Sequence, residues 1–128
     1  MINARRSTKA VHYASQAACC HLADSLPPGC KHDFETYAAI VAPLEACGVV
    51  CSGKFWPCRN IADDPEQDFV MDPKDFAVAA LRGAVTAVLH SHPMGGPASA
   101  ADLLACRGTR LPWHIYSIPD EQWSTINP

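Results

Sequence analysis

Two histidines, His90 and His92, stand at the end of an apolar stretch and are the first residues whose types and spacing suggest chemistry. The preceding residues, 84–89 (AVTAVL), have the composition of a buried β-strand. Residues two apart in a strand face the same side, so both imidazole rings would point to one face and could chelate a single metal ion. A His-x-His pair alone is weak evidence, because strand-end histidines are often satisfied by ordinary hydrogen bonds.

A carboxylate follows at a suitable place for a third ligand. Asp102 lies ten residues after His92 and three after Ser99, near the start of a predicted helix. Three protein ligands leave the fourth tetrahedral position for water, which is the arrangement of a catalytic zinc site. Ser99 and Asp102 also fit a helix N-cap with an acidic residue in the first turn, and the two roles can coexist.

Catalysis at such a site needs a base near the metal. Zinc lowers the pKa of a bound water toward neutrality, and a nearby carboxylate can then take its proton. Glu45, at the mouth of a predicted strand, is the candidate base. On its own Glu45 fits a solvated edge charge equally well, because glutamate usually stays exposed. Cys47 is interpreted as a small buried hydrophobe, since no motif places a histidine base beside it.

Three short motifs together resemble the JAMM/MPN+ zinc metalloprotease family. They are EACG at residues 45–48, HSHP at residues 90–93 and SAAD at residues 99–102, within a resemblance that covers about residues 33–118. The resemblance implies a cytidine-deaminase-like mixed sheet with flanking helices. It further implies that His90, His92 and Asp102 hold Zn²⁺, that Glu45 activates water as general base, and that Ser99 stabilises the oxyanion.

Within that family the chain looks closest to the phage branch, the N-terminal domain of tail tip assembly proteins similar to that of phage lambda. The segments FWPCRNIADDP (residues 55–65) and LPWHIYS (residues 111–117) carry this closer likeness. It implies a zinc-dependent peptidase or isopeptidase that acts on a peptide, a protein or peptidoglycan during tail assembly or penetration of the host cell wall. The implied partners are phage tail proteins, and the implied location is the host cytoplasm during assembly or the virion.

The chain departs from the family pattern in two respects. The usual spacing places seven residues between the second histidine and the serine, whereas six residues separate His92 from Ser99 here. Two glycines in this shortened loop give it conformational freedom. Phage tail proteins of this kind also commonly continue into a cell-wall cysteine peptidase domain, whereas this sequence stops at Pro128.

Two other functions compete with the peptidase. One is an assembly or scaffolding module that retains the fold for binding and has little peptidase activity; the intact ligand set favours the enzyme. The other is a zinc deaminase, which would need H-x-E and P-C-x-x-C motifs, and neither occurs in the sequence.

The pattern of apolar residues predicts an α/β or α+β domain, in which helices pack on a mixed sheet. Helices are expected at residues 33–42, 72–81 and 99–106. Strands are expected at residues 46–51, 54–56, 69–71, 84–89 and 113–118, with the first two forming a hairpin. The mostly polar residues 120–128 are expected to be an ending or the start of a linker.

Length and composition limit the number of domains, the partners and the location that the chain can have. A chain of 128 residues favours one domain, which we place at residues 33–128, after a basic flexible leader at residues 1–32 that ends near a Pro-Pro-Gly turn. The net charge of -3 argues against a nucleic-acid partner, and no apolar run is long enough for a membrane span. Seven cysteines without a C-x-x-C pair favour reduced thiols in a cytoplasmic protein. The alternative that the cysteines and histidines of residues 19–32 bind a metal has no familiar spacing in its favour.

Overall fold

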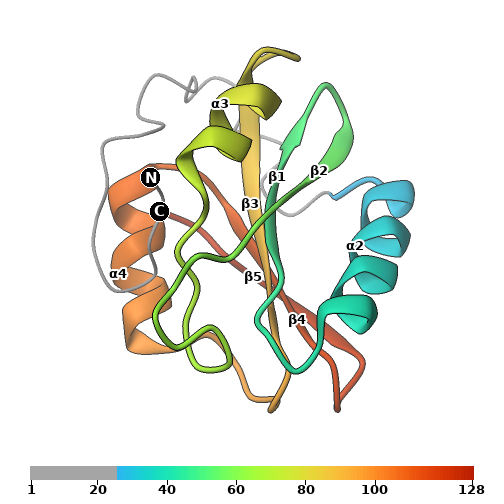
Figure 1. Cartoon of the computed structure of the whole chain (residues 1–128), viewed down its shortest axis with the longest axis vertical. Coiled ribbons are helices and arrows are strands. Elements are labelled where there is room, and N and C mark those ends of the chain that lie inside the picture. The colour runs from blue at the N-terminus through green and yellow to red at the C-terminus, as the bar shows by residue number, and fades with distance from the viewer. Residues whose placement is uncertain (1–25) are drawn as a thin grey trace.

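The computed structural model describes residues 26–128. These residues form an α/β fold with a five-stranded mixed sheet and three helices (Figure 1). In chain order the elements are α2 (Pro28–Val41), β1 (Cys47–Cys51), β2 (Lys54–Cys58), α3 (Pro73–Ala80), β3 (Val85–His92), α4 (Ala100–Thr109), β4 (Trp113–Ser117) and β5 (Gln122–Ile126). The predicted α/β class is therefore confirmed.

The strands lie in the order β2-β1-β3-β4-β5. β1 pairs antiparallel with both β2 and β3, and β5 pairs antiparallel with β4. β3 and β4 are parallel, and α4 makes the crossover that a parallel connection requires. This topology places β3 at the centre of the sheet, with a neighbour on each side.

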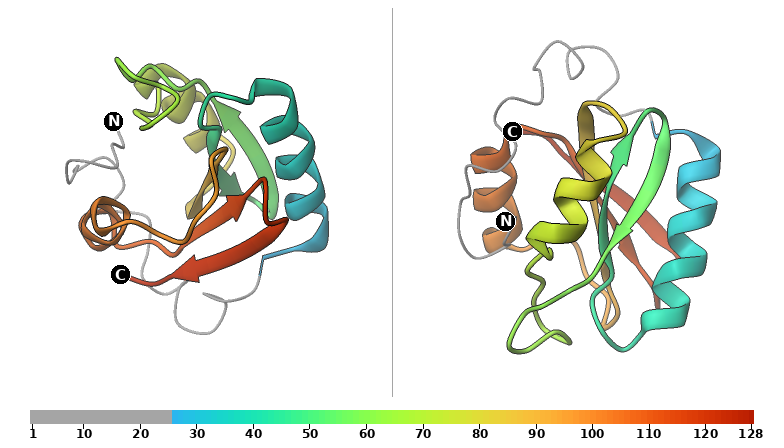
Figure 2. Two further views of the ribbon diagram at one scale, coloured as in Figure 1. Left: turned by 90° about the horizontal axis from the view of Figure 1, so that it is seen from below. Right: turned by 45° about the horizontal axis from the view of Figure 1, so that its top comes forward.

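Helices cover both faces of the sheet. α2 lies on one face, whereas α3 and α4 lie on the other (Figures 1 and 2). The alternation along β3 explains the two layers, because successive side chains point to opposite faces. Ala87 and Leu89 pack in the cluster beneath α2, whereas Val88 packs in the cluster with α3 and α4. His90, two residues after Val88, shares the α3 and α4 face.

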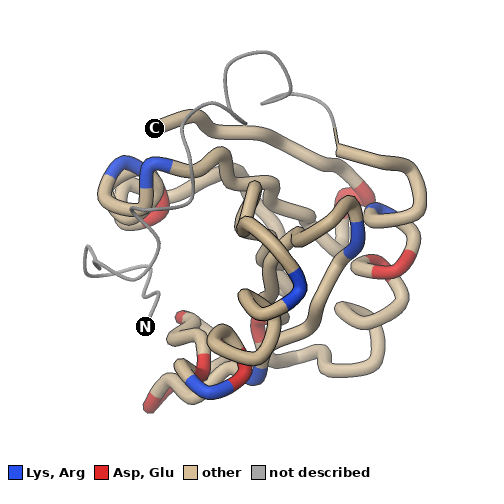
Figure 3. Tube along the Cα trace, turned by 90° about the horizontal axis from the view of Figure 1, so that it is seen from above, with Lys and Arg blue, Asp and Glu red and all other residues tan. Residues whose placement is uncertain are grey.

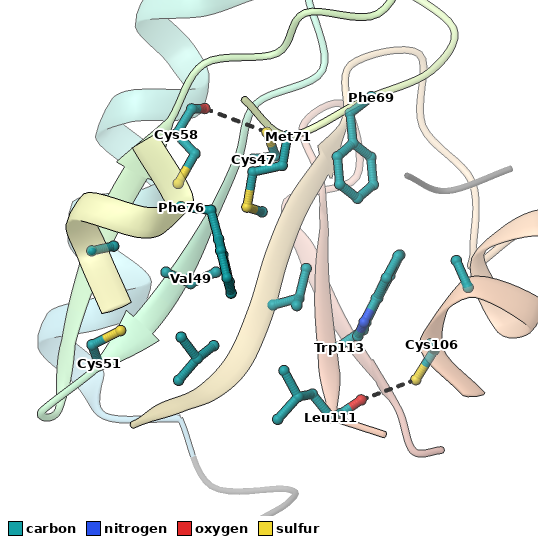
Figure 4. Packing of buried hydrophobic residues seen from close by; sticks show 14 residues of the cluster. Cys47, Val49, Cys51, Cys58, Phe69, Met71, Phe76, Cys106, Leu111 and Trp113 are labelled. Atoms are coloured by element: carbon teal, nitrogen blue, oxygen red, sulfur yellow. Dashed lines mark hydrogen bonds between the residues drawn. The ribbon is translucent and has the colours of Figure 1, made fainter. Parts of the chain in front are cut away.

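The cluster on the α3 and α4 face is the larger of the two (Figure 4). Phe76 of α3, Cys106 of α4 and Trp113 of β4 pack in it, with Phe69 from the loop before α3. Trp113 Nε1 donates to Thr109 Oγ1 at 2.9 Å, so the buried indole has its partner. The end of β3 packs against this cluster, because His90 contacts Phe69 and Trp113.

The first helix begins earlier than the sequence pattern predicts. The predicted start at Asp33 is wrong, because α2 begins at Pro28. The Pro-Pro-Gly string is the start of the helix and not a turn near the end of a leader. Proline is tolerated in the first helical turn, where its missing N–H has no partner to lose. The helix ends before Pro43, since a residue that precedes proline is pushed into an extended conformation, and Ala42 has ψ 142°.

Two further expectations need correction. Residues 69–71 are not a strand, because they form isolated β-bridge contacts, such as the one between Asn60 and Met71. The polar tail forms β5, which pairs along the whole of β4. β5 is mostly polar because it is an edge strand whose residues are exposed or only partly buried. Its Trp123 packs against Phe34 of α2.

Other predicted elements are confirmed. The hairpin β1–β2 forms, and α3 begins after Asp72, whose Oδ1 accepts the Lys74 N–H at 2.8 Å. Most of the predicted leader, including Cys19, Cys20 and His21, lies outside the described residues. In the part of the chain that the structure describes, the helices are too short or too polar to cross a membrane.

Candidate metal centre

The end of β3 presents the two predicted histidines. His90 is completely buried, and its ring stacks on Phe69 with 4.6 Å between centroids and meets Trp113 edge-on at 5.6 Å. His92 is partly exposed at the last residue of the strand, and its ring centroid is 4.9 Å from that of His90. The same-face geometry predicted from their spacing is therefore present.

The first turn of α4 presents Asp102. Ser99 Oγ accepts the Asp102 N–H at 3.0 Å, and the Ser99 N–H donates to Asp102 Oδ2 at 2.9 Å. This reciprocal pair is a capping box, which satisfies two backbone groups that a helix start would leave without partners. The cap also fixes the direction of the Asp102 side chain, which is buried and points toward the histidines.

The structure brings His90, His92 and Asp102 together. Asp102 Oδ1 lies 3.1 Å from His90 Nε2, and Asp102 Oδ2 lies 3.1 Å from His92 Nε2. One donor atom from each of the three residues lies within 4.8 Å of the others. Two imidazoles and one carboxylate at this separation are a donor set that suits zinc.

His90 supports the fit of a cation on independent grounds. Both of its ring nitrogens are buried, and within the described residues neither forms a hydrogen bond of good geometry, although Glu45 Oε1 is 3.4 Å and Asp102 Oδ1 is 3.1 Å away. Buried polar groups without hydrogen bonds are rare in folded proteins. A cation between the imidazoles and the carboxylate would be a partner for Nε2, which lies beside Asp102, and would leave Nδ1–H facing the Glu45 carboxylate.

The charges of the site influence each other strongly. Burial alone lowers the pKa of His90, but the carboxylates of Asp102 and Glu45 outweigh burial and raise it to about 9. Burial alone raises the pKa of Asp102, but His90, His92 and the Ser99 N–H outweigh burial and hold that pKa far below its usual range. The site thus stabilises the ionised carboxylate of Asp102 beside the positive charge of a protonated His90.

The second nitrogen of His92 has a backbone partner. Nδ1 lies 3.1 Å from the carbonyl oxygen of Gly96, in the loop between β3 and α4. A carbonyl can only accept, so Nδ1 carries the proton in this hydrogen bond and Nε2 faces Asp102. Ligating histidines are commonly oriented in this manner by a partner on the other nitrogen.

Pairing between β1 and β3 positions Glu45. Cys47 is opposite His90 in the register, the Ala46 N–H donates to Ser91 Oγ at 2.8 Å, and the Ser91 N–H donates to the Ala46 carbonyl at 3.0 Å. These bonds hold Glu45, the residue before Ala46, beside the end of β3. Its carboxylate is buried, so the alternative of a solvated edge charge is wrong in this structure.

Asn60 is a residue of the site that the sequence interpretation missed. Its Nδ2 donates to the carbonyls of Glu45 at 3.0 Å, Pro65 at 3.2 Å and Asp68 at 2.8 Å. Its Oδ1 accepts backbone N–H groups of Ala62 and Val70, both at 3.0 Å. One side chain thereby organises the loop between β2 and α3 and holds Glu45. The only local signal is an asparagine just after a strand, which is typical of turns.

A cleft of about 250 Å³ opens beside the three residues. The loop between β2 and α3 forms one wall, and the loop after β3 forms the other. Glu45, His92, Ser99 and Asp102 all line it, so the predicted catalytic residues reach a common cavity. The lining residues in the described part of the chain include four carboxylates and no Lys or Arg. Figure 3 marks the acidic residues of the loop between β2 and α3.

Cys47 has the surroundings of a core residue, as predicted. Its side chain is completely buried, and Sγ lies 3.4 Å from the Cys58 carbonyl (Figure 4). Burial, followed by the nearby Cys58 and Glu45, raises the pKa of the thiol well above its usual value. A thiol that keeps its proton is a poor nucleophile.

Comparisons with known proteins point to phage tails and to the fold. No known family profile matches the chain. The chain is 40% identical over 97 residues to the tail tip assembly protein K of Escherichia phage N15, a match that covers 72% of this chain and 40% of that relative. The solution structure of protein DSY2949 from Desulfitobacterium hafniense is similar with a TM-score of 0.60 and 24% identity, over 77% of each chain. That structural likeness supports the fold alone.

Proposed function

We propose that this chain is a zinc-dependent peptidase or isopeptidase of the JAMM type, with the fold of that family, and that it acts in phage tail assembly or in penetration of the host cell wall. The observation that carries the proposal is the meeting of His90, His92 and Asp102 at one point, beside a buried glutamate and a cleft. The likeness to a tail tip assembly protein supplies the biological setting.

His90, His92 and Asp102 would hold the zinc ion. When bound there, zinc polarises the scissile carbonyl and lowers the pKa of the attacking water. The buried Nε2 of His90 favours this assignment, because it lies beside Asp102 and the described protein groups supply it with no hydrogen bond of good geometry. The metal itself is identified by the chemistry of the donor set.

Glu45 would act as general base and then as general acid. Its carboxylate takes a proton from the attacking water as the new C–O bond forms, and delivers a proton to the leaving amine as the C–N bond breaks. Ser99 would donate a hydrogen bond from its hydroxyl group to the carbonyl oxygen, on which negative charge develops. The capping bond uses the Ser99 oxygen only as an acceptor, so the hydroxyl proton remains available for this role.

The proposed substrates are a peptide, a tail protein or the peptide part of peptidoglycan. The proposed partners are other phage tail proteins, and the proposed location is the host cytoplasm during assembly, with a place in the virion afterwards. The chain spans about two fifths of the length of the tail tip relative, so the activity of that whole protein is not transferred to this chain.

A second candidate function is an assembly or scaffolding module with little peptidase activity. The name of the phage N15 relative, which refers to assembly, favours it. In this alternative the zinc centre would stabilise the fold and the cleft would bind a partner without hydrolysis. The two functions differ in one measurable respect, which is turnover that depends on Glu45.

The Glu45→Gln variant separates these functions. The amide keeps the shape of the side chain and removes the base, so hydrolysis should fall by about two to four orders of magnitude. Zinc content should remain at the parent level, because all three ligands are present. Elemental analysis and cleavage of a panel of peptides, tail proteins and peptidoglycan fragments give the two measurements.

Each result has a defined meaning. A variant that cleaves as fast as the parent would show that Glu45 is not the base, and a variant that loses zinc would show that Glu45 is a ligand or a structural residue. A parent that binds zinc fully but cleaves no member of the panel would favour the assembly module. A parent without zinc would refute the metal centre itself.

A further inference from the structure

The loop between β3 and α4 turns back on the strand that precedes it. The Gly95 N–H donates to the His92 carbonyl at 3.1 Å, and the Gly96 carbonyl accepts from the His92 ring. Both glycines have positive φ, 91° and 95°, which other residues rarely adopt. Glycine is also free to leave such a conformation, so contacts from outside the loop can help to fix the position of the Gly96 carbonyl.

Asp120, in the turn between β4 and β5, makes those contacts. Its Oδ2 accepts the Ser117 hydroxyl at 2.6 Å and the Gly96 N–H at 3.5 Å. A side chain added to Gly95 would first meet the same Oδ2, at 3.4 Å, so the carboxylate lies against both glycines. The Ile118 N–H donates to the His92 carbonyl at 3.2 Å, which joins the turn to the end of β3.

These contacts connect Asp120 to the metal centre through one peptide group. Asp120 holds the N–H of Gly96, and the carbonyl of Gly96 holds Nδ1–H of His92. With Nδ1 protonated, the lone pair of Nε2 is available toward Asp102 Oδ2, 3.1 Å away. Partners on the outer nitrogen of a ligating histidine set the tautomer and the ring orientation.

We propose that Asp120 is a positioning residue for His92, which it orients through Gly96 for metal binding. The inference rests on the proposed metal centre. It also explains how the shortened loop works. With only six residues between His92 and Ser99, the loop still brings Asp102 to the histidines, in a conformation that the turn between β4 and β5 stabilises. Asp120 itself is not among the described residues that line the cleft.

Three variants of the full chain test the proposal. Asp120→Ala removes the acceptor, whereas Asp120→Asn retains an oxygen that can accept from both Ser117 and Gly96. Asp33→Ala removes an exposed carboxylate from α2, on the other side of the sheet, and serves as the matched control for net charge. Zinc affinity is measured by competition with a chromophoric chelator, and thermal unfolding of the metal-free proteins reports any general loss of stability.

Outer partners of metal ligands typically contribute about ten- to a hundredfold in affinity. Since Asp120 acts through one further peptide group, we expect Asp120→Ala to weaken zinc binding about five- to tenfold. Asp120→Asn and Asp33→Ala should stay within about twofold of the parent. An Asp120→Ala protein that binds zinc as tightly as the parent would overturn the proposal. Equal losses in the Ala and Asn variants would overturn it as well, because charge alone would then be responsible.

A second measurement does not depend on zinc. Nitrogen NMR spectra of the His92 ring in the metal-free protein show whether Nδ1 carries a proton and how fast it exchanges with water. We expect a protonated, slowly exchanging Nδ1 in the parent and faster exchange in Asp120→Ala, with recovery in Asp120→Asn. Unchanged exchange in Asp120→Ala refutes the positioning role even if the parent binds no zinc, a result that would separately refute the proposed function.

Discussion

Ser99 Oγ accepts the Asp102 N–H at 3.0 Å, and Asp102 Oδ2 accepts the Ser99 N–H at 2.9 Å. This reciprocal pair begins α4 and also aims the Asp102 carboxylate at His90 and His92. Helix stability and the proposed chemistry therefore depend on the same two side chains. Variants that keep one function and remove the other can separate them.

Asp102→Asn should abolish tight zinc binding while α4 stays capped. The amide oxygen can still accept the Ser99 N–H, but the neutral side chain no longer offers a charged ligand. The loss of affinity should exceed the roughly hundredfold upper effect of outer partners, because Asp102 would contact the metal directly. Chelator competition gives the affinity, and the unfolding midpoint of the metal-free protein is the control for the cap. Retention of one zinc per chain by this variant would exclude Asp102 as a ligand.

Ser99→Ala should retain zinc and lose both the cap and the oxyanion donor. The lost cap should cost about 1 kcal/mol of the free energy of unfolding, measured in urea without metal. The lost donor should reduce kcat by about 10²- to 10³-fold on any substrate found in the panel. Ser99→Thr keeps a hydroxyl and is the matched control, for which we expect near-parent values of both. Parent-like turnover in Ser99→Ala would remove Ser99 from the mechanism.

Gly48→Ala should destabilise the sheet for steric reasons alone. A side chain at Gly48 would overlap the Phe55 ring and the Trp56 carbonyl. We expect a loss of about 1–3 kcal/mol in the free energy of unfolding, the usual cost of overpacking. Gly29→Ala is the matched control, because nothing lies within 4 Å of that position in α2, and it should stabilise by about 0.4–1 kcal/mol. Urea unfolding of the two variants gives both values, and equal midpoints would contradict the packing argument.

The buried thiols should make the folded protein less stable at alkaline pH. Burial, with smaller contributions from nearby carboxylates, raises the pKa of Cys58 and Cys106 to about 12, and burial raises that of Cys51 to about 11. In the unfolded chain these thiols ionise near pH 9, so above that pH the unfolded state has lost protons that the folded state keeps. Stability is therefore retained below pH 9 and falls above it, up to about pH 11 for Cys51 and about pH 12 for Cys58 and Cys106, by at most roughly 1.4 kcal/mol per pH unit for each such thiol.

Urea unfolding at pH 7 and pH 10, with reductant present, measures this fall. Alkylation with iodoacetamide at pH 8, mapped by mass spectrometry, provides the second readout, because a thiol that keeps its proton reacts slowly. We expect the three cysteines to react much more slowly in the native chain than in urea. Equal rates in both states would show that these thiols are accessible in the folded protein.

The sequence by itself determined the features that depend on near neighbours. The period of two along β3 places His90 and His92 on one face, and Asp72 followed by Pro73 determines where α3 begins. The spacing of Ser99 and Asp102 likewise determines the capping box, because residues three apart meet in the first turn of a helix. Each of these relationships is confined to a few residues and needs no other part of the chain.

The tertiary structure alone decided which distant groups meet. Glu45 lies beside His90, 45 residues later, because β1 pairs with β3 in one particular register. The same cause made β5 a strand, since a polar segment is ordered when β4 offers a free edge with unpaired backbone groups. The roles of Asn60 and Asp120 also depend on loops that are folded against other elements. Local composition does not predict such partners, because hydrogen bonds between distant segments depend on the packing of the whole chain.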